Sequence, residues 1–153
     1  MSITKWAKNP IYAYRFAHTL WSYRAPLLPS LITYFIRLFY SCYLPHQARI
    51  GKGCVLAYGG LGIVIHQRAV IGDNCHINQG VTIGGTSKNA NVPRVGDNVF
   101  IGAGAIVLGD VNIGSNSVIG ANAVVVRDVD SGSLMVGVPA KKIKSGIKKS
   151  DYV

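Results

Sequence analysis

Residues 101–129 read IGAGAIVLGDVNIGSNSVIGANAVVVRDV, with an aliphatic residue at every sixth position and glycine after most of them. The same spacing extends back to residue 65, with one double step between residues 83 and 95. A period of six fits neither an α-helix, with about 3.6 residues per turn, nor a long alternating strand. It predicts short strands with a corner after each, so that three strands close one coil of eighteen residues. The aliphatic positions are Ile65, Ile71, Ile77, Ile83, Val95, Ile101, Val107, Ile113, Ile119 and Val125.

A second set of residues, four positions after each aliphatic one, is small or β-branched. We expect both sets to point into the coil and to stack from one turn to the next. Cys54 and Cys75 occupy this small position, so both are predicted core residues. The three cysteines are odd in number and lack CxxC spacing, so neither a disulfide framework nor a metal site is predicted. The small set is Ala69, Cys75, Val81, Val99, Ala105, Val111, Ser117, Ala123 and Val129.

The charge of the chain is strongly unbalanced. Its 153 residues suit one domain, the net charge is +10, there is no glutamate, and the first acid is Asp73. Such a field attracts cofactor phosphates, anionic lipid or nucleic acid. Nucleic acid would explain the charge but not the repeat, and no recognition motif supports it, so we expect no nucleic-acid partner. No cleavable signal peptide is evident, so we expect a cytoplasmic protein, with association at the inner face of the membrane left open.

The first 46 residues are predicted to form a helical segment. Asn9-Pro10 suits the start of one helix, and Ser30 is expected to cap a second. Apolar residues of the second helix recur at the spacing of one helix face, and the segment is too short to span a bilayer. Two interpretations stay open: this stripe packs on the adjacent domain or on a neighbouring subunit, or it makes peripheral contact with a membrane. The stripe is Leu31, Tyr34, Phe35, Leu38 and Cys42.

Three stretches, IGDNCHINQGVTIGG (71–85), the stretch quoted first, and VGVPAKKI (136–143), resemble the hexapeptide-repeat acyltransferases. Within them, the serine acetyltransferase-like branch that includes polysaccharide O-acetyltransferases is the most similar. The resemblance implies a mainly β fold, a left-handed parallel β-helix that works as a homotrimer with acetyl-CoA in grooves between subunits. The predicted organisation is a helical segment (1–46), a β-helix domain (47–144) and a basic tail (145–153).

The repeat is irregular at two places, where functional sites are expected. AYGGLG (57–62) inserts three residues between in-phase aliphatic positions. GTSKNANVPR (85–94) is polar and lies within the double step between residues 83 and 95, so we expect a protruding loop there.

His66 follows the first irregularity and occupies a corner position usually held by glycine. One coil of eighteen residues brings Gly84 and Gly85 beside it, which leaves open space for an extended thiol arm and a backbone oxyanion contact. A histidine with a pKa near 6.5 is mostly neutral at cellular pH and suits a general base. The alternative is a surface histidine on a corner. We predict that His66 is the catalytic base and that Gly84 and Gly85 contact the cofactor.

The resemblance also implies coenzyme A contacts at small residues, which let the pantetheine approach the backbone, and at cations, which meet its phosphates. These residues are Ala103, Ala121, Arg127, Lys141 and Lys144. Tyr58 and Asn78 are predicted to bind the acceptor.

The chain departs from the serine acetyltransferase pattern in three places. The position of the catalytic histidine of those enzymes falls nearest Tyr58, and the aspartate paired with it falls near Tyr43. Their arginine–histidine pair falls on Asn91 and Val92, so the arginine that clamps an amino-acid carboxylate is missing there.

We therefore predict an acetyl-CoA-dependent O-acetyltransferase that uses no metal and acts on a sugar or lipid-linked sugar hydroxyl in surface polysaccharide biosynthesis. Two alternatives stay open: a serine O-acetyltransferase, and a catalytically inactive trimeric β-helix scaffold. A carbonic anhydrase on the same architecture needs three histidine ligands, which this chain does not supply.

Overall fold

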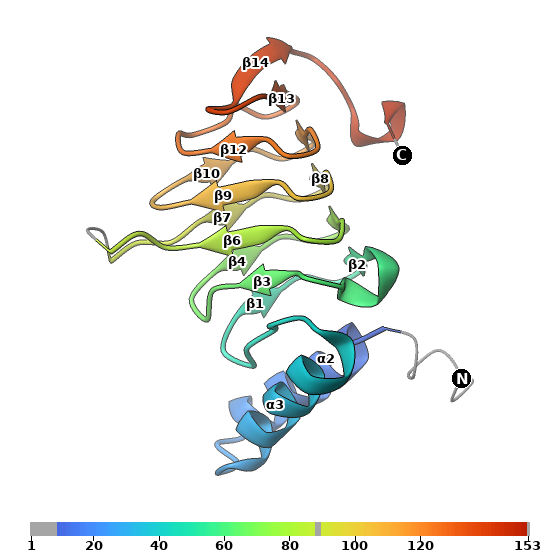
Figure 1. The fold of residues 1–153 in the computed structure, drawn as a ribbon, viewed down its shortest axis with the longest axis vertical. Helices are drawn as coiled ribbons and strands as arrows, with labels where there is room; N and C mark the ends of the chain where they lie inside the picture. Colours follow the sequence, from blue (N-terminus) through green and yellow to red (C-terminus); the bar gives the residue numbers. More distant parts are fainter. Residues whose placement is uncertain (1–8, 88–89, 153) are drawn as a thin grey trace.

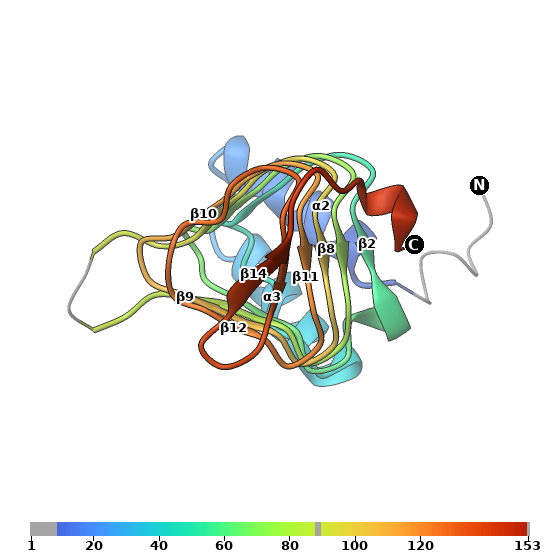
Figure 2. The ribbon, with the colours of Figure 1, turned by 90° about the horizontal axis from the view of Figure 1, so that it is seen from above.

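The computed structural model describes residues 9–87 and 90–152. Stacked coils of short strands form a column, and two helices lie across its N-terminal end (Figure 1). The strands within each face of the column are parallel, apart from the last pair, β13 and β14. Seen from the C-terminal end in Figure 2, the chain turns clockwise as it rises toward the viewer, which is the left-handed sense. The predicted fold, a mainly β left-handed parallel β-helix after a helical hairpin, is confirmed.

The described coils have three faces. Face A holds β3 (Val64–Ile65), β6 (Thr82–Gly84), β9 (Ile106–Leu108) and β12 (Val124–Val125). Face B holds β1 (Arg49–Ile50), β4 (Val70–Ile71), β7 (Arg94–Val95) and β10 (Asn112–Ile113). Face C holds β2 (Val55–Leu56), β5 (His76–Ile77), β8 (Phe100–Ile101), β11 (Val118–Ile119), β13 (Leu134–Val136) and β14 (Lys141–Lys144). The short helix η2 (Lys149–Asp151) follows β14.

The interior of the column is built from the two repeated sets of residues. Each aliphatic sixth-position residue and each small residue of the second set is buried, including the side chain of Ser117. Cys54 and Cys75 are also buried, and both thiols are free. Because an entire hexad contributes only two inward side chains, the core is a thin stack of aliphatic and small layers. The prediction that the cysteines are core residues is confirmed.

Hydrogen bonds at the corner between faces B and C measure the length of each coil. The Lys52 amide donates to the Asp73 carboxylate 21 residues on, and the Asp73 amide donates to Asp97 24 residues on. The Asp97 amide donates to Ser115 18 residues on. The regular coil is therefore 18 residues, with three extra residues in the first interval and six in the second. The three form part of η1 (Ala57–Gly60) and the turn after it, and the six belong to the segment between β6 and β7, which projects from the column in Figure 2.

The helices differ from the expectation in detail. Helix α2 (Ile11–Ser22) begins after Pro10, and the Asn9 side chain accepts a hydrogen bond from the Ile11 amide, as a cap does. Helix α3 (Leu28–Tyr40) begins before Ser30, so the prediction that Ser30 caps it is wrong. The reason is that Pro29 fits within the first turn, where a helix needs no amide donor.

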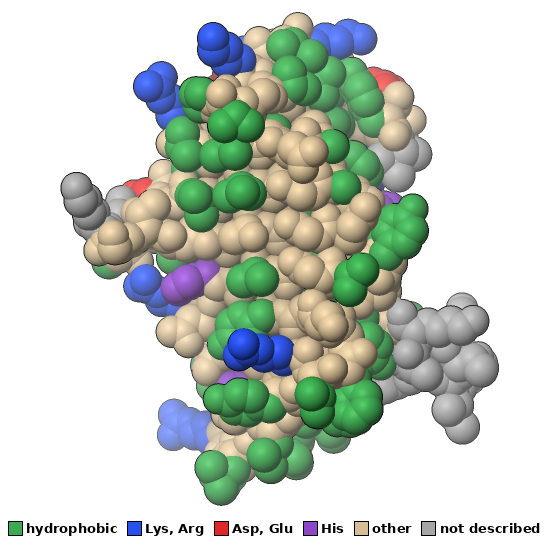
Figure 3. Space-filling model, in the orientation of Figure 1, with side chains coloured by type: hydrophobic (Ala, Val, Ile, Leu, Met, Phe, Trp, Pro, Cys, Tyr) green, Lys and Arg blue, Asp and Glu red, His purple; other side chains and the backbone are tan. Residues whose placement is uncertain are grey.

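The apolar stripe of α3 does not pack on the column. Of the predicted stripe, Leu31, Tyr34, Phe35 and Leu38 are exposed, whereas Cys42 lies beyond the end of α3 and is buried in the core. On α3 itself Pro29, Thr33 and Ile36 are buried. Figure 3 shows apolar side chains gathered at this helical end, while lysine and arginine side chains crown the C-terminal end. None of the described helices is long and apolar enough to cross a membrane.

Candidate active site

His66 lies at the corner where face A turns into face B, directly after β3. Its amide donates to the Ile83 carbonyl of the next coil (2.8 Å), which fixes the backbone at this corner. The side chain is half-buried, and its imidazole edge lies beside Gly85: a Cβ added there would stand 3.9 Å from Nε2. Gly85 places no side chain next to Nε2, and Val92 borders the same space, with its Cγ1 3.3 Å from that added Cβ.

The ring of His66 has a defined orientation. The Arg68 amide donates a hydrogen bond to Nδ1 (3.1 Å), so the neutral ring carries its proton on Nε2 in this arrangement. Burial, and then the positive charge of Arg68, lower the pKa of His66 below its usual value of 6.5. The ring is therefore mostly neutral at neutral pH. The corner that holds the ring also supplies the contact that selects its tautomer.

A cavity of about 260 Å³ lies against this corner. Its walls include Tyr43, Val64, His66 and Gly84. Tyr43 belongs to the segment before the first coil strand and pairs in parallel with Val64. The sequence identifies Tyr43 only as the position of a missing aspartate. Its alternation with buried Cys42 and Leu44 was the signal that the Tyr43 side chain faces outward, where a wall residue belongs.

The structure places the predicted acceptor residues away from this cavity. Tyr58 lies in η1 with 78% of its surface exposed and a left-handed backbone (φ 51°). The Asn78 side-chain amide donates to the carbonyl of Ile101 (3.0 Å). Both follow strands of face C, so they lie at the corner between faces C and A, whereas His66 follows a strand of face A. Face A therefore separates them from His66 within one chain.

Two of the predicted coenzyme A residues share that second corner. Ala103 and Ala121 follow β8 and β11 and lie in successive coils, joined by the hydrogen bond from the Asn122 amide to the Ala103 carbonyl (2.8 Å). Ala103 is half-buried and Ala121 is exposed, and neither places a bulky side chain on this corner. Asn78 precedes this position by one residue in the coil before them, because Ile77 pairs with Ile101.

The predicted cations lie at the C-terminal end of the column. Arg127 and Lys141 line one cavity of about 310 Å³, whose floor includes Val125 and Met135. Lys144 is exposed at the end of β14 and does not line this cavity. Between these lysines, Lys142 donates to the Asp130 carboxylate (2.7 Å) and is already paired. The cavity thus brings together two of the three predicted cations.

The loop expected at 85–94 connects β6 to β7. At its base the Asn91 side chain donates to the carboxylate of Asp110 (2.9 Å), and Val92 stands beside Gly85. Over residues 9–87 and 90–152 there is no cluster of three or more metal-ligating side chains.

Comparison with known proteins assigns these features to one family. Residues 93–127 match the family model described as bacterial transferase hexapeptide (six repeats). A serine acetyltransferase of Synechococcus elongatus is 42% identical over 141 residues, covering 90% of this chain and 57% of that protein. The chain thus spans little more than half the length of that relative.

Solved structures agree with the sequence matches. The crystal structure of Neisseria gonorrhoeae serine acetyltransferase has a TM-score of 0.85 and 38% identity, covering 91% of this chain and 55% of that one. A serine acetyltransferase in complex with CoA has a TM-score of 0.81 and 35% identity, covering 88% of this chain and 55% of that one.

These matches correct the predicted acceptor. The prediction of a sugar hydroxyl in surface polysaccharide biosynthesis is wrong, because the relatives are serine acetyltransferases. The alternative, a serine O-acetyltransferase, fits them better. The coil geometry agrees with these enzymes over most of the chain, although the arginine expected at Asn91 is missing. The chain belongs to the hexapeptide-repeat acyltransferase family.

Proposed function

We propose that this protein is an acetyl-CoA-dependent O-acetyltransferase whose acceptor is the hydroxyl of serine. The observation that carries the proposal is the open cavity at His66, bordered by Gly84, in a chain 42% identical to a serine acetyltransferase. No other described histidine lines this cavity. His46 is buried under the helices, and His76 packs against Phe100 on face C.

In the proposed reaction His66 is the general base. It takes the proton of the serine hydroxyl as that oxygen attacks the thioester carbonyl carbon. The carbon–sulfur bond then breaks, and the departing sulfur receives the proton to give the CoA thiol. Backbone amides near Gly84 and Gly85 hold the negative oxygen of the tetrahedral intermediate. No covalent enzyme intermediate is required.

The tautomer of His66 sets a cost for this role. A base at Nε2 must carry its proton on Nδ1, so the hydrogen bond from the Arg68 amide has to be given up. One hydrogen bond contributes about 1 kcal/mol net, whereas a general base contributes about 10²–10⁴ in rate, or about 3–5 kcal/mol. The gain exceeds the cost, so the base role stands with its rate lowered about tenfold or less.

The assembly we propose is a homotrimer with acetyl-CoA between subunits. Within one chain the His66 corner and the corner of Ala103 and Ala121 lie on opposite edges of face A. In a groove between two copies, the His66 corner of one subunit faces the corner of Ala103 and Ala121 of its neighbour. Arg127, Lys141 and Lys144 at the C-terminal end supply positive charge for the phosphates of the cofactor. Membrane contact through the helices stays a prediction.

The test is thiol release from acetyl-CoA, measured with L-serine and with a panel of sugars for the wild type, His66→Ala and His76→Ala. His76→Ala is the matched control because it removes a half-buried histidine from a different face. We expect serine-dependent release that falls about 10²–10⁴-fold in His66→Ala alone, at an unchanged melting temperature.

Three outcomes would contradict the proposal. Absence of serine-dependent release would refute the acceptor, and release that depends only on sugars would do the same. A His66→Ala variant within threefold of wild type would refute the base.

A further inference from the structure

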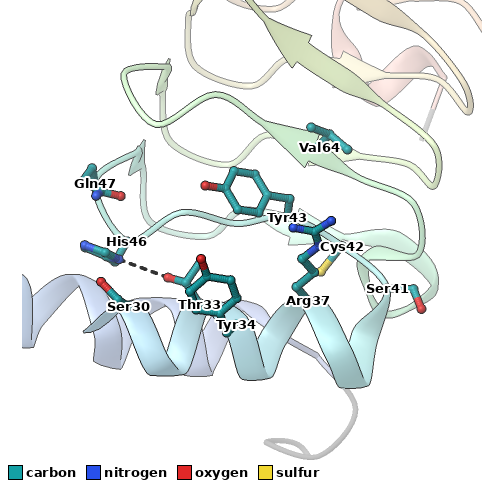
Figure 4. A pocket seen from close by; sticks show the side chains of 10 residues that line it. All are labelled: Ser30, Thr33, Tyr34, Arg37, Ser41, Cys42, Tyr43, His46, Gln47 and Val64. Carbon is teal, nitrogen blue, oxygen red and sulfur yellow. Dashed lines mark hydrogen bonds between the residues drawn. The ribbon is translucent and has the colours of Figure 1, made fainter. Parts of the chain in front are cut away.

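A second cavity, of about 600 Å³, lies between helix α3 and the first coils (Figure 4). Tyr34 and Arg37 rise into it from α3, and Tyr43 and Val64 face them from the coil side. The hydroxyls and the amide around its rim come from Ser30, Ser41 and Gln47. The cavity has aromatic walls, neutral polar groups and one guanidinium, and its size is within the range of small-molecule sites.

Arg37 is the one permanently charged group among the described residues that line this cavity. His46 lies on the wall too, but burial lowers its pKa and its Nδ1 meets the Thr33 hydroxyl (3.1 Å). The sequence has no acid before Asp73, so the helices and the first coil offer Arg37 no carboxylate. In the part of the chain that the structure describes, Arg37 forms no ion pair. An anion for Arg37 has to come from outside these elements.

This cavity shares part of its wall with the cavity at His66. Tyr43 and Val64 line both. Backbone bonds hold this shared wall: the Tyr43 amide donates to Ile63 (2.8 Å), and the Ile65 amide donates to Tyr43 (3.0 Å). The two cavities therefore share the wall of Tyr43 and Val64, with His66 in one and Arg37 in the other. The shared wall is part of the coil, so its position does not depend on the loop at 85–94.

We propose that Arg37 binds the carboxylate of the acceptor and makes the enzyme selective for hydroxy acids over neutral alcohols. This inference rests on the proposed function, because it places the reacting hydroxyl at His66. The guanidinium fork matches a carboxylate with two parallel hydrogen bonds. The space on both sides of Tyr43, about 260 and 600 Å³, also admits hydroxy acids longer than serine.

The experiment compares acids with their amides, which keep the hydroxyl and lose the negative charge. Thiol release is measured with L-serine, L-homoserine and the carboxamide of each, for the wild type, Arg37→Ala, Arg37→Lys and Arg49→Ala. Arg49 is the matched control, because it is an exposed arginine on β1 that lines neither cavity. Calorimetric titration of L-serine and L-serinamide in the presence of CoA supplies a readout that needs no turnover.

We expect Arg37→Ala to raise KM for at least one of the acids about 10- to 100-fold, with kcat and the KM for acetyl-CoA unchanged. The amides should react alike in wild type and variant, and Arg37→Lys should recover only part of the loss. Equal effects on acids and amides, or Arg37→Ala that matches Arg49→Ala, would overturn the inference.

The failure of the proposed function would look different. If no acceptor supports thiol release, catalysis is refuted, and the titration alone then decides about Arg37. Wild type that binds serine no better than serinamide refutes the carboxylate site. Tighter binding of serine that Arg37→Ala abolishes supports it. Should Arg37→Ala fail to fold, Arg37→Lys still tests the two-bond contact: it should bind serine more weakly than wild type, and binding equal to wild type would overturn the inference.

Discussion

The coils bury their regularly spaced apolar residues, whereas helix α3 exposes its own. In the coils every aliphatic residue of the six-residue repeat is buried, with Val107 and Ile119 completely enclosed. On α3 the apolar stripe is exposed, with 77% of Leu38 and 62% of Leu31 open to solvent. Both patterns are equally regular in the sequence. Periodicity therefore tells which residues share a face, but only the surrounding structure decides whether that face meets the core.

The difference in burial arises because each coil closes on itself and a helix does not. A coil of three short strands closes on itself, so its inward side chains are enclosed whatever lies outside. A helix does not enclose its own side chains, and one side of α3 is already buried, with Pro29 and Ile36 on it. The stripe on its far side therefore stays exposed in a single chain, because packing buries only one side of a surface helix.

The largest effect is expected from Ala105→Lys, which tests the closure of the coil. Ala105 is completely buried, so the new ammonium group must be neutralised inside the column. Full burial shifts the pKa of a lysine by up to about 5 units, a cost of about 7 kcal/mol, similar to the whole stability of a domain. We expect loss of the cooperative melting transition. A normal melting curve would show that position 105 does not point inward.

The two regions also differ in what their histidines do, which a pH series can measure. Burial, then the charge of Arg68, lowers the pKa of His66, and the base works only when neutral. Serine-dependent kcat/KM should therefore be level above about pH 6.5 and fall about tenfold per pH unit below the lowered pKa. A rate that rises on acidification would contradict the base role.

His46, under the helices, should instead affect stability. Burial, and then the charge of His18, lowers its pKa, so below about pH 6.5 the unfolded chain binds a proton that the folded chain does not. The free energy of unfolding should therefore decrease as the pH falls from about 6.5 to the lowered pKa of His46. His46→Gln should make that decrease smaller but not remove it, because His66 and His76 also have lowered pKa values. Melting temperatures across the series, with His46→Gln beside wild type, separate this loss of fold from the loss of rate.

The sequence predicted the coils better than the site, for a physical reason. Each coil repeats the same local constraint, so the small set at Val81 or Ala123 could be assigned from spacing alone. A site joins residues that no local rule connects: Tyr43 reaches His66 only because the chain enters the column beside β3. The Arg68 amide on the His66 ring depends on the turn geometry of one corner. The acceptor class came from similarity to relatives, not from spacing.

The smallest effect on stability is expected from Leu38→Lys, although it makes the same kind of change as Ala105→Lys. Leu38 is 77% exposed, so the added charge stays in water and the free energy of unfolding should change by less than about 0.5 kcal/mol. A loss as large as that of Ala105→Lys would mean that α3 is buried in the native assembly. Light scattering distinguishes that case, since a subunit contact broken by the charge lowers the mass from a trimer toward 16.4 kDa.

Sedimentation with vesicles that contain anionic phospholipid tests whether the exposed stripe of α3 contacts a membrane. Arg15 on α2, Arg24 just after it and Arg37 on α3 give the described helical end positive charge, and the sequence has no acid before Asp73 to offset it. Wild type should sediment with anionic but not with neutral vesicles, and Leu38→Lys should bind more weakly because its apolar contact is lost even though its charge is higher. Tighter binding of Leu38→Lys would mean that charge alone drives the contact. In that case the apolar stripe would belong to a subunit interface. The coils would then bury their apolar residues within one chain, and α3 would bury its stripe between two chains.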